Sequence, residues 1–162
     1  MATLSEPLKT FRFLVTVEYD PIEKEDSGVI VAAFSRFSGI KMHTDTVRIR
    51  SGSERRGVID TVPALTSFEN VTLEKGVIGD DDFLKWILAV APNSIAPPTG
   101  TLATRTINIE ALDDKGDSVI TWSLISAMPV AYELDGMDGT RSEVLCESIE
   151  FEIKGFKREK HF

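Results

Sequence analysis

The sequence predicts a mainly β fold with one helix and a projecting arm. Several segments alternate apolar and polar residues with a period of two, one segment has a helical period, and one long extended segment is polar on both faces. The chain has 162 residues, of which 42% are hydrophobic and 27% are charged. These values are typical of one globular domain, which we expect to span residues 1–162.

The first two predicted strands occupy 11–19 and 28–34. In the first, Val15 and Val17 share an apolar face, whereas Thr16 lies on the opposite face, as in a half-buried strand. The second is apolar on both faces, which favours a central strand.

A long arm is predicted next, over residues 44–62. The segment 40–50 is rich in β-branched residues but too polar on both faces to be buried in its own domain. A glycine-containing tip follows at 51–57, the chain returns through 58–61, and Val62-Pro63-Ala64 ends the arm. Its arginines are either solvated or contact another subunit.

A strand at 68–75 precedes the one predicted helix. Phe83, Trp86, Ile87 and Val90 follow the i, i+3, i+4, i+7 pattern, and the aspartates at 80–82 suit a helix N-terminus. The alternative, that these aspartates bind a cation, is disfavoured because an EF-hand needs alternating ligands and a distant Glu.

The remaining predicted strands form a hairpin and a closing strand. The segments 104–112 and 118–125 flank the turn 113–117, and Pro129-Val130 bends the chain after the hairpin. The last predicted strand is 143–153, and 155–162 is a basic tail.

Charge and composition exclude several classes of function. The chain has 26 acidic and 18 basic residues, so its net charge of -8 disfavours binding to duplex DNA or to an anionic membrane. Cys146 is the only cysteine, which excludes an internal disulfide, and we expect it to be a small packed residue. The first ten residues do not resemble a signal peptide, so we expect folding in a cytosol.

No catalytic or cofactor site is predicted. His43 and His161 lack a neighbouring nucleophile motif, and order near the C-terminus is doubtful. The Gly52–Gly57 spacing lacks the Lys and Ser/Thr of a phosphate-binding loop. We therefore expect a protein that is not an enzyme and binds no cofactor or metal.

A series of motifs resembles the tail tube proteins of contractile phage tails and contractile injection systems. The matching segments lie between 11 and 155 and read FSRFSGI (34–40), VRIRSG (47–52), VPA (62–64), NVTLEKG (70–76), DFLKW (82–86), WSLISAMP (122–129) and EVLCESIEF (143–151). Departures from the family pattern are Ala64 in place of Gly, Ser126 in place of Asn, Met128 in place of Trp, and a proline-rich loop at 91–100.

The resemblance implies a two-sheet β-barrel or sandwich flanked by one helix. It further implies a structural protein that stacks as homohexameric rings into the inner tube of a contractile particle. Such a subunit is made in the bacterial cytoplasm and contacts sheath, baseplate or hub, and terminator proteins. The tube conducts DNA or effectors without specific binding when the sheath contracts, and it has no stable membrane anchor.

The resemblance also implies roles for particular residues. Arm residues expected at the oligomer interface are Thr44, Thr46, Arg48, Arg50, Ser51, Gly52, Arg55, Arg56, Gly57 and Val62. Helix residues expected to face the sheath are Asp81, Asp82 and Lys85. The segments 3–10 and 155–162 are expected to contact adjacent rings, and part of the acidic charge is expected to face the lumen.

Two other functions remain open at this stage. One is a tube initiator, a tube terminator or a secreted ring of the same fold. The other is a small monomeric β-barrel that binds a ligand.

Overall fold

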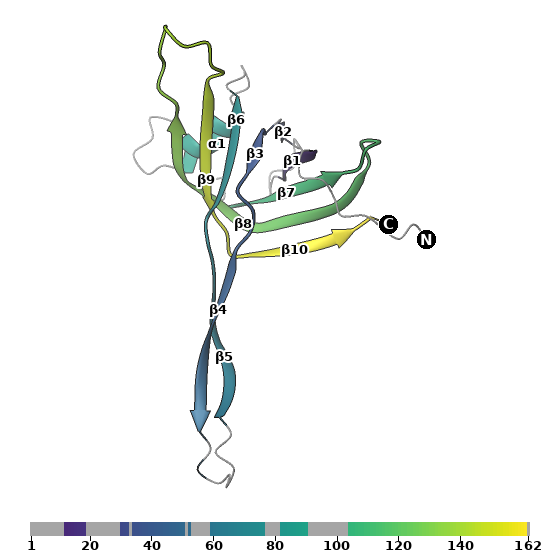
Figure 1. Cartoon of the computed structure of the whole chain (residues 1–162), viewed down its shortest axis with the longest axis vertical. Coiled ribbons are helices and arrows are strands. Elements are labelled where there is room, and N and C mark those ends of the chain that lie inside the picture. Colours follow the sequence, from purple (N-terminus) through teal and green to yellow (C-terminus); the bar gives the residue numbers. More distant parts are fainter. Residues whose placement is uncertain are drawn as a thin grey trace.

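Ten strands and one helix make up the fold (Figure 1). The computed structural model describes residues 12–18, 30–32, 34–50, 52, 59–76, 82–90 and 104–161. In chain order the elements are β1 (Phe13–Glu18), β2 (Ile30–Ala32), β3 (Arg36–Phe37), β4 (Met42–Arg50), β5 (Ile59–Phe68), β6 (Val71–Gly76), α1 (Asp82–Val90), β7 (Arg105–Leu112), β8 (Ser118–Leu134), β9 (Cys146–Glu152) and β10 (Gly155–Lys160).

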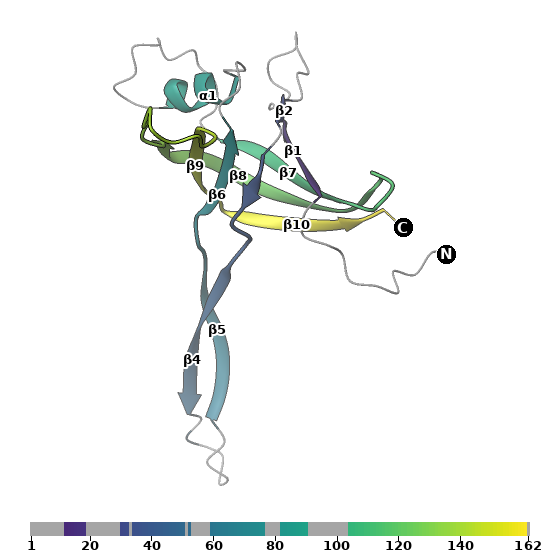
Figure 2. The same ribbon diagram turned by 45° about the horizontal axis from the view of Figure 1, so that its top comes forward.

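Two layers of antiparallel strands share the long strand β8. The five-stranded layer contains β2, β1, β7, the first half of β8 and β10. The four-stranded layer contains the second half of β8, β9, β6 and β3, and its strands run across those of the first layer (Figures 1 and 2). The described strands close no barrel, so of the two expected architectures the sandwich is confirmed.

Alternating side chains from both layers meet in one core. Val15, Val17 and Leu124 come from the five-stranded layer, and Leu73 and Phe151 come from the four-stranded layer. All five are fully buried. Burial of each such side chain contributes about 1.5–3 kcal/mol, so this face-to-face contact stabilises the sandwich.

The switch of β8 between the layers falls at Ser126. Its φ angle is 54°, the left-handed region that residues with a Cβ adopt at a cost. Beside it, the backbone N–H of Lys154 donates to the Ile125 carbonyl (3.1 Å) where the chain passes from β9 to β10. The two chain segments therefore turn the same corner together.

Helix α1 is confirmed over Asp82–Val90. Trp86 is 2% exposed and stacks on Phe151, with ring centroids 5.4 Å apart, and the Arg105 guanidinium lies 5.0 Å from the Trp86 ring centroid. The predicted cap residues 80 and 81 lie outside the described residues. The helix lies at the end of the molecule opposite the arm (Figure 2).

The turn between β7 and β8 also forms as predicted. The Asp113 carboxylate accepts hydrogen bonds from the backbone N–H groups of Lys115 and Asp117, both at 2.9 Å, and Gly116 has a φ of 93°. These backbone donors, Asp117 first, hold the pKa of Asp113 below its usual value.

Three predicted strands differ from those observed. The strand expected to be central, β2, pairs with β1 alone among the described strands and ends the strand order, because apolar faces report burial and not which strand edges are paired. The expected basic tail contains β10, which pairs along β8. The expected strand 68–75 is divided between the end of β5 and β6.

The arm is longer than predicted. Its two strands pair from Met42 with Phe68 to Arg50 with Ile59, so Pro63 does not end it. A register shift between Thr44 and Thr46 marks a bulge that lets the ladder continue beside the proline.

None of the helices in the described part of the chain is long and apolar enough to cross a membrane.

Candidate assembly surfaces

The arm forms a two-stranded sheet of its own, apart from the sandwich. It is fixed at its base, where Phe68 meets Phe156 edge to face at 6.2 Å and the Glu69 backbone N–H donates to the Lys41 carbonyl at 3.0 Å. Beyond this base it projects away from both layers (Figure 1). A two-stranded ribbon is marginally stable alone, so this arm needs another surface to cover it.

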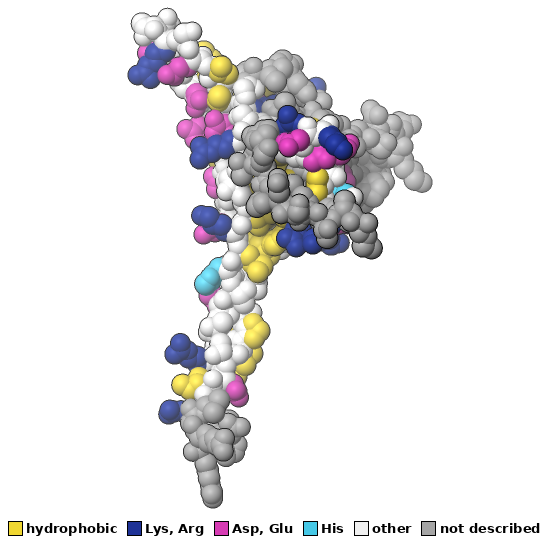
Figure 3. Space-filling model, turned by 45° about the vertical axis from the view of Figure 1, so that its right-hand side comes forward, with side chains coloured by type: hydrophobic (Ala, Val, Ile, Leu, Met, Phe, Trp, Pro, Cys, Tyr) yellow, Lys and Arg dark blue, Asp and Glu magenta, His cyan; other side chains and the backbone are white. Residues whose placement is uncertain are grey.

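The two faces of the arm differ in charge. Strand alternation places Thr44, Thr46, Arg48 and Arg50 on one face, together with Thr61, the direct partner of Arg48; we call this set the arginine face. Neither arginine forms an ion pair with another described residue. Figure 3 shows Lys and Arg side chains standing along one side of the arm.

The opposite arm face is apolar and acidic. Val47 pairs with Val62, and Ile49 pairs with Asp60. The three apolar side chains are 51%, 41% and 51% exposed for Val47, Val62 and Ile49. Exposed apolar strands attract other strands, so this face too is suited to contact another chain.

The structure thus brings together four of the predicted interface residues and separates one. Thr44, Thr46, Arg48 and Arg50 share the arginine face, whereas Val62 lies on the apolar face. Gly52 is exposed at the tip. The predicted interface residues that lie outside the described residues are Ser51, Arg55, Arg56 and Gly57.

A second surface is the outer face of the four-stranded layer, the side turned away from the core. Its acidic side chains are Glu74, Glu133, Glu150 and Glu152, and Arg36 is the basic residue that accompanies them. Cys146 lies on the same face and is partly exposed, so it is not the fully packed residue that the sequence predicted. Its thiol pKa is raised by burial and by the nearby carboxylates of Glu74 and Asp135.

Four residues form one row across this outer face. Glu133 is paired with Ser148, Ser148 with Glu74, and Glu74 with Arg36. The row therefore begins with an acid on β8 and ends with a base on β3. Single-sequence reasoning detects the alternation in β9 but not this row, which depends on the pairing register.

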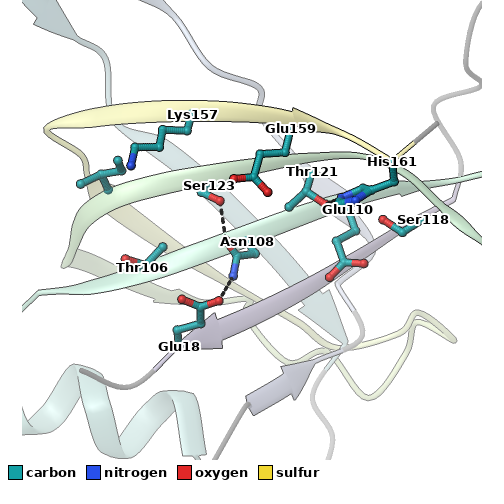
Figure 4. Close-up of a pocket in the computed structure, with 11 residues that line it drawn as sticks. Glu18, Thr106, Asn108, Glu110, Ser118, Thr121, Ser123, Lys157, Glu159 and His161 are labelled. Atoms are coloured by element: carbon teal, nitrogen blue, oxygen red, sulfur yellow. Dashed lines mark hydrogen bonds between the residues drawn. The ribbon is translucent and has the colours of Figure 1, made fainter. Parts of the chain in front are cut away.

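A third surface is a polar concavity of about 650 Å³ on the outer face of the five-stranded layer (Figure 4). The Asn108 amide donates to Glu18 Oε1 (2.7 Å), and the Ser123 hydroxyl donates to Asn108 Oδ1 (2.7 Å). Thr121 Oγ1 lies 2.7 Å from Nε2 of His161, so the predicted disorder of this histidine is wrong. The open, hydrogen-bonded surface is suited to water or a polar partner.

The helix residues expected to face a sheath are only partly visible. Asp82 begins α1, Lys85 is exposed on it, and Asp81 lies outside the described residues. Among the described residues no group of three His, Cys, Asp or Glu side chains is arranged to hold a metal ion.

A sandwich with a coreless arm and charged faces defines a structural subunit that assembles with other chains. Comparison with family models identifies which one. Residues 9–157 match the family described as T4-like virus tail tube protein gp19, and the chain belongs to this family. The sequence resemblance is thereby confirmed.

Solved structures share the fold over nearly the whole chain. A chain of the anti-feeding prophage baseplate has a TM-score of 0.77 and 21% identity, covering 97% of this chain and 98% of that one. A chain of the sheath–tube complex of the extracellular contractile injection system PVC, in its extended state, has 0.75 and 22%, covering 98% and 95%. A chain of the anti-feeding prophage tube-terminating cap has 0.75 and 23%, covering 99% and 96%. A search of curated proteins finds no match.

Proposed function

We propose that this tail tube protein assembles as homohexameric rings that stack into the inner tube of a contractile tail or injection particle. The observation that carries the proposal is the arm, a two-stranded sheet with charged and apolar side chains exposed on opposite faces and no core of its own. Membership of the tail tube family supplies the kind of assembly.

The arm is assigned to contacts between subunits and between rings. Strand β4 has nine residues, which corresponds to a reach of about 30 Å and is enough to cross onto a neighbouring copy. On the arginine face, Arg48 and Arg50 offer fork-shaped donors to carboxylates of a chain that is acidic overall.

The outer face of the four-stranded layer is assigned to the lumen. Helix α1 packs through Trp86 on Phe151, whose side chain points to the opposite side of this layer. A lumenal outer face therefore turns the helix, with Asp81, Asp82 and Lys85, toward a sheath. Four glutamates on this face would repel DNA phosphates, so that nucleic acid or effector cargo slides without binding.

The remaining partners follow from the same assembly. The structures with this fold come from baseplate, cap and sheath–tube assemblies, which supports contacts with sheath, baseplate and terminator proteins. The proposed role is structural, with synthesis in the bacterial cytoplasm and use in the assembled particle.

Variants of the arm test this function. Arg48→Glu with Arg50→Glu, or deletion of residues 51–56, should leave the thermal unfolding of the dilute chain unchanged and abolish tubes seen by electron microscopy. A matched reversal on the five-stranded layer, Lys157→Glu with Arg158→Glu, controls for the change in net charge. Arm variants that form tubes of normal length would contradict the assignment.

A further inference from the structure

The four-stranded layer has two edges that no described strand covers. At one end is β3, which pairs with β6. At the other end is the segment of β8 from Met128 to Leu134, which pairs with β9. An uncovered strand edge presents free backbone donors and acceptors, which proteins either protect or pair with another chain.

The β8 edge carries little protection against pairing. Val130, Tyr132 and Leu134 are 44%, 39% and 44% exposed, and no Lys or Arg lies in this part of the strand. By contrast, the edge strand β10 of the other layer carries Lys157, Arg158 and Lys160, which oppose edge-to-edge pairing. The β8 edge is therefore the one suited to receive a strand.

We infer that the β8 edge of one copy pairs with the β3 edge of the next, so that the four-stranded layers join around the ring. This inference rests on the proposed function and identifies the two strands that meet. Within the layer each neighbouring pair is antiparallel, so β3 runs opposite to β8. Placing a second copy beside the first continues the same antiparallel alternation across the junction.

Side chains at the two edges are complementary on both faces. On the outer face, the row that begins at Glu133 ends at Arg36, so the junction brings opposite charges together. On the inner face, a parallel row runs from Tyr132 through Ile149 and Leu73 to Phe37, so the junction brings two aromatic rings together.

A charge exchange tests the junction. Arg36→Glu or Glu133→Arg alone places like charges side by side and should raise the protein concentration needed for ring assembly about tenfold. The double variant should restore the wild-type concentration. Glu133→Arg combined with Arg158→Glu has the same net charge as the double variant but should not restore assembly, because Arg158 lies on β10.

A cysteine pair provides a second measurement. In a Cys146→Ser background, Phe37→Cys and Tyr132→Cys lie three strand spacings apart within one chain, about 14 Å, which is too far for a disulfide. Oxidation should therefore link separate chains, up to a covalent hexamer in denaturing gels. Phe156→Cys with Tyr132→Cys is the matched control and should give no such series.

The outcomes separate this inference from the proposed function. Wild-type tubes together with failed charge rescue or with no interchain disulfide would overturn the β8–β3 junction and leave the tube function standing. A wild-type chain that remains monomeric would overturn both. Charge rescue with a covalent hexamer supports both.

Discussion

The ammonium group of Lys75 lies 3.2 Å from Glu147 Oε1, and both residues are buried, with 4% and 9% of their surface exposed. The second oxygen of Glu147 accepts a hydrogen bond from the Tyr132 hydroxyl at 2.7 Å. These contacts link β6, β9 and β8 on the inner side of the four-stranded layer. A buried charge is stable only with such partners, which makes this contact sensitive to single changes.

Removing one partner of this pair should cost more than removing both. We expect Lys75→Met to lower the free energy of unfolding by about 3 kcal/mol, because it leaves a buried carboxylate, and Lys75→Met with Glu147→Leu to cost about 1 kcal/mol. Urea denaturation of the dilute chain measures both values. Lys41→Met, which breaks the exposed Lys41–Glu69 contact of 3.3 Å, is the control and should cost less than about 1 kcal/mol. Additive costs would contradict this account.

Tyr132 should make stability depend on alkaline pH. Its hydrogen bond to the Glu147 carboxylate, with burial and the negative charge, raises its pKa from 10.0 to about 12. Because the folded-state pKa is the higher one, the stabilisation is complete below pH 10.0 and is lost as the pH rises toward about 12. Tyr132→Phe should remove this part of the pH dependence. Ultraviolet titration that finds Tyr132 ionising at its ordinary value in the folded chain would refute the prediction.

Ser126 should be improved by substitution. Asn tolerates a positive φ better than Ser does, so Ser126→Asn should raise the free energy of unfolding by about 0.5 kcal/mol. Ser126→Val should lower it by at least about 1 kcal/mol, because a β-branched residue is strained there. Ser148→Asn, in a regular strand, should bring no gain in thermal unfolding experiments. A stabilising Val variant would show that the conformation at Ser126 is not strained.

The contact of Trp86 with Phe151 should hold α1 on the sandwich. Trp86→Ala should cost about 3–5 kcal/mol, the usual loss for a buried aromatic ring. Trp86→Phe should retain part of the stacking and cost less. Leu88→Ala, on the same helix but 46% exposed, is the control and should cost about 1 kcal/mol or less by chemical denaturation. Equal losses at 86 and 88 would contradict this packing.

Local periodicity was sufficient to predict the helix, the β7–β8 turn and the inward residues of β1. The signals for these features, such as Trp86 four residues before Val90, lie within a few positions of each other. The existence of the arm was predictable because 40–50 has too little apolar area for a core. Its continuation past Pro63 was not, since it depends on a bulge in the pairing with β4.

Contacts between distant segments account for the features that the sequence did not predict. Strand β10 looks like a basic tail until Phe156 is seen opposite Leu124. The charge row from Glu133 to Arg36 requires the register of four strands, and no local pattern encodes it. For the arm, alternation alone places Arg48 and Arg50 together, but their partner surface needs the assembly.

Electron cryomicroscopy of the assembled chain tests the central claim most directly. The account predicts hollow tubes with sixfold symmetry, in which each arm lies against a neighbouring copy and the glutamates of the four-stranded layer line the lumen. A monomer, or a tube in which the arms project into solvent and contact no other subunit, would contradict it.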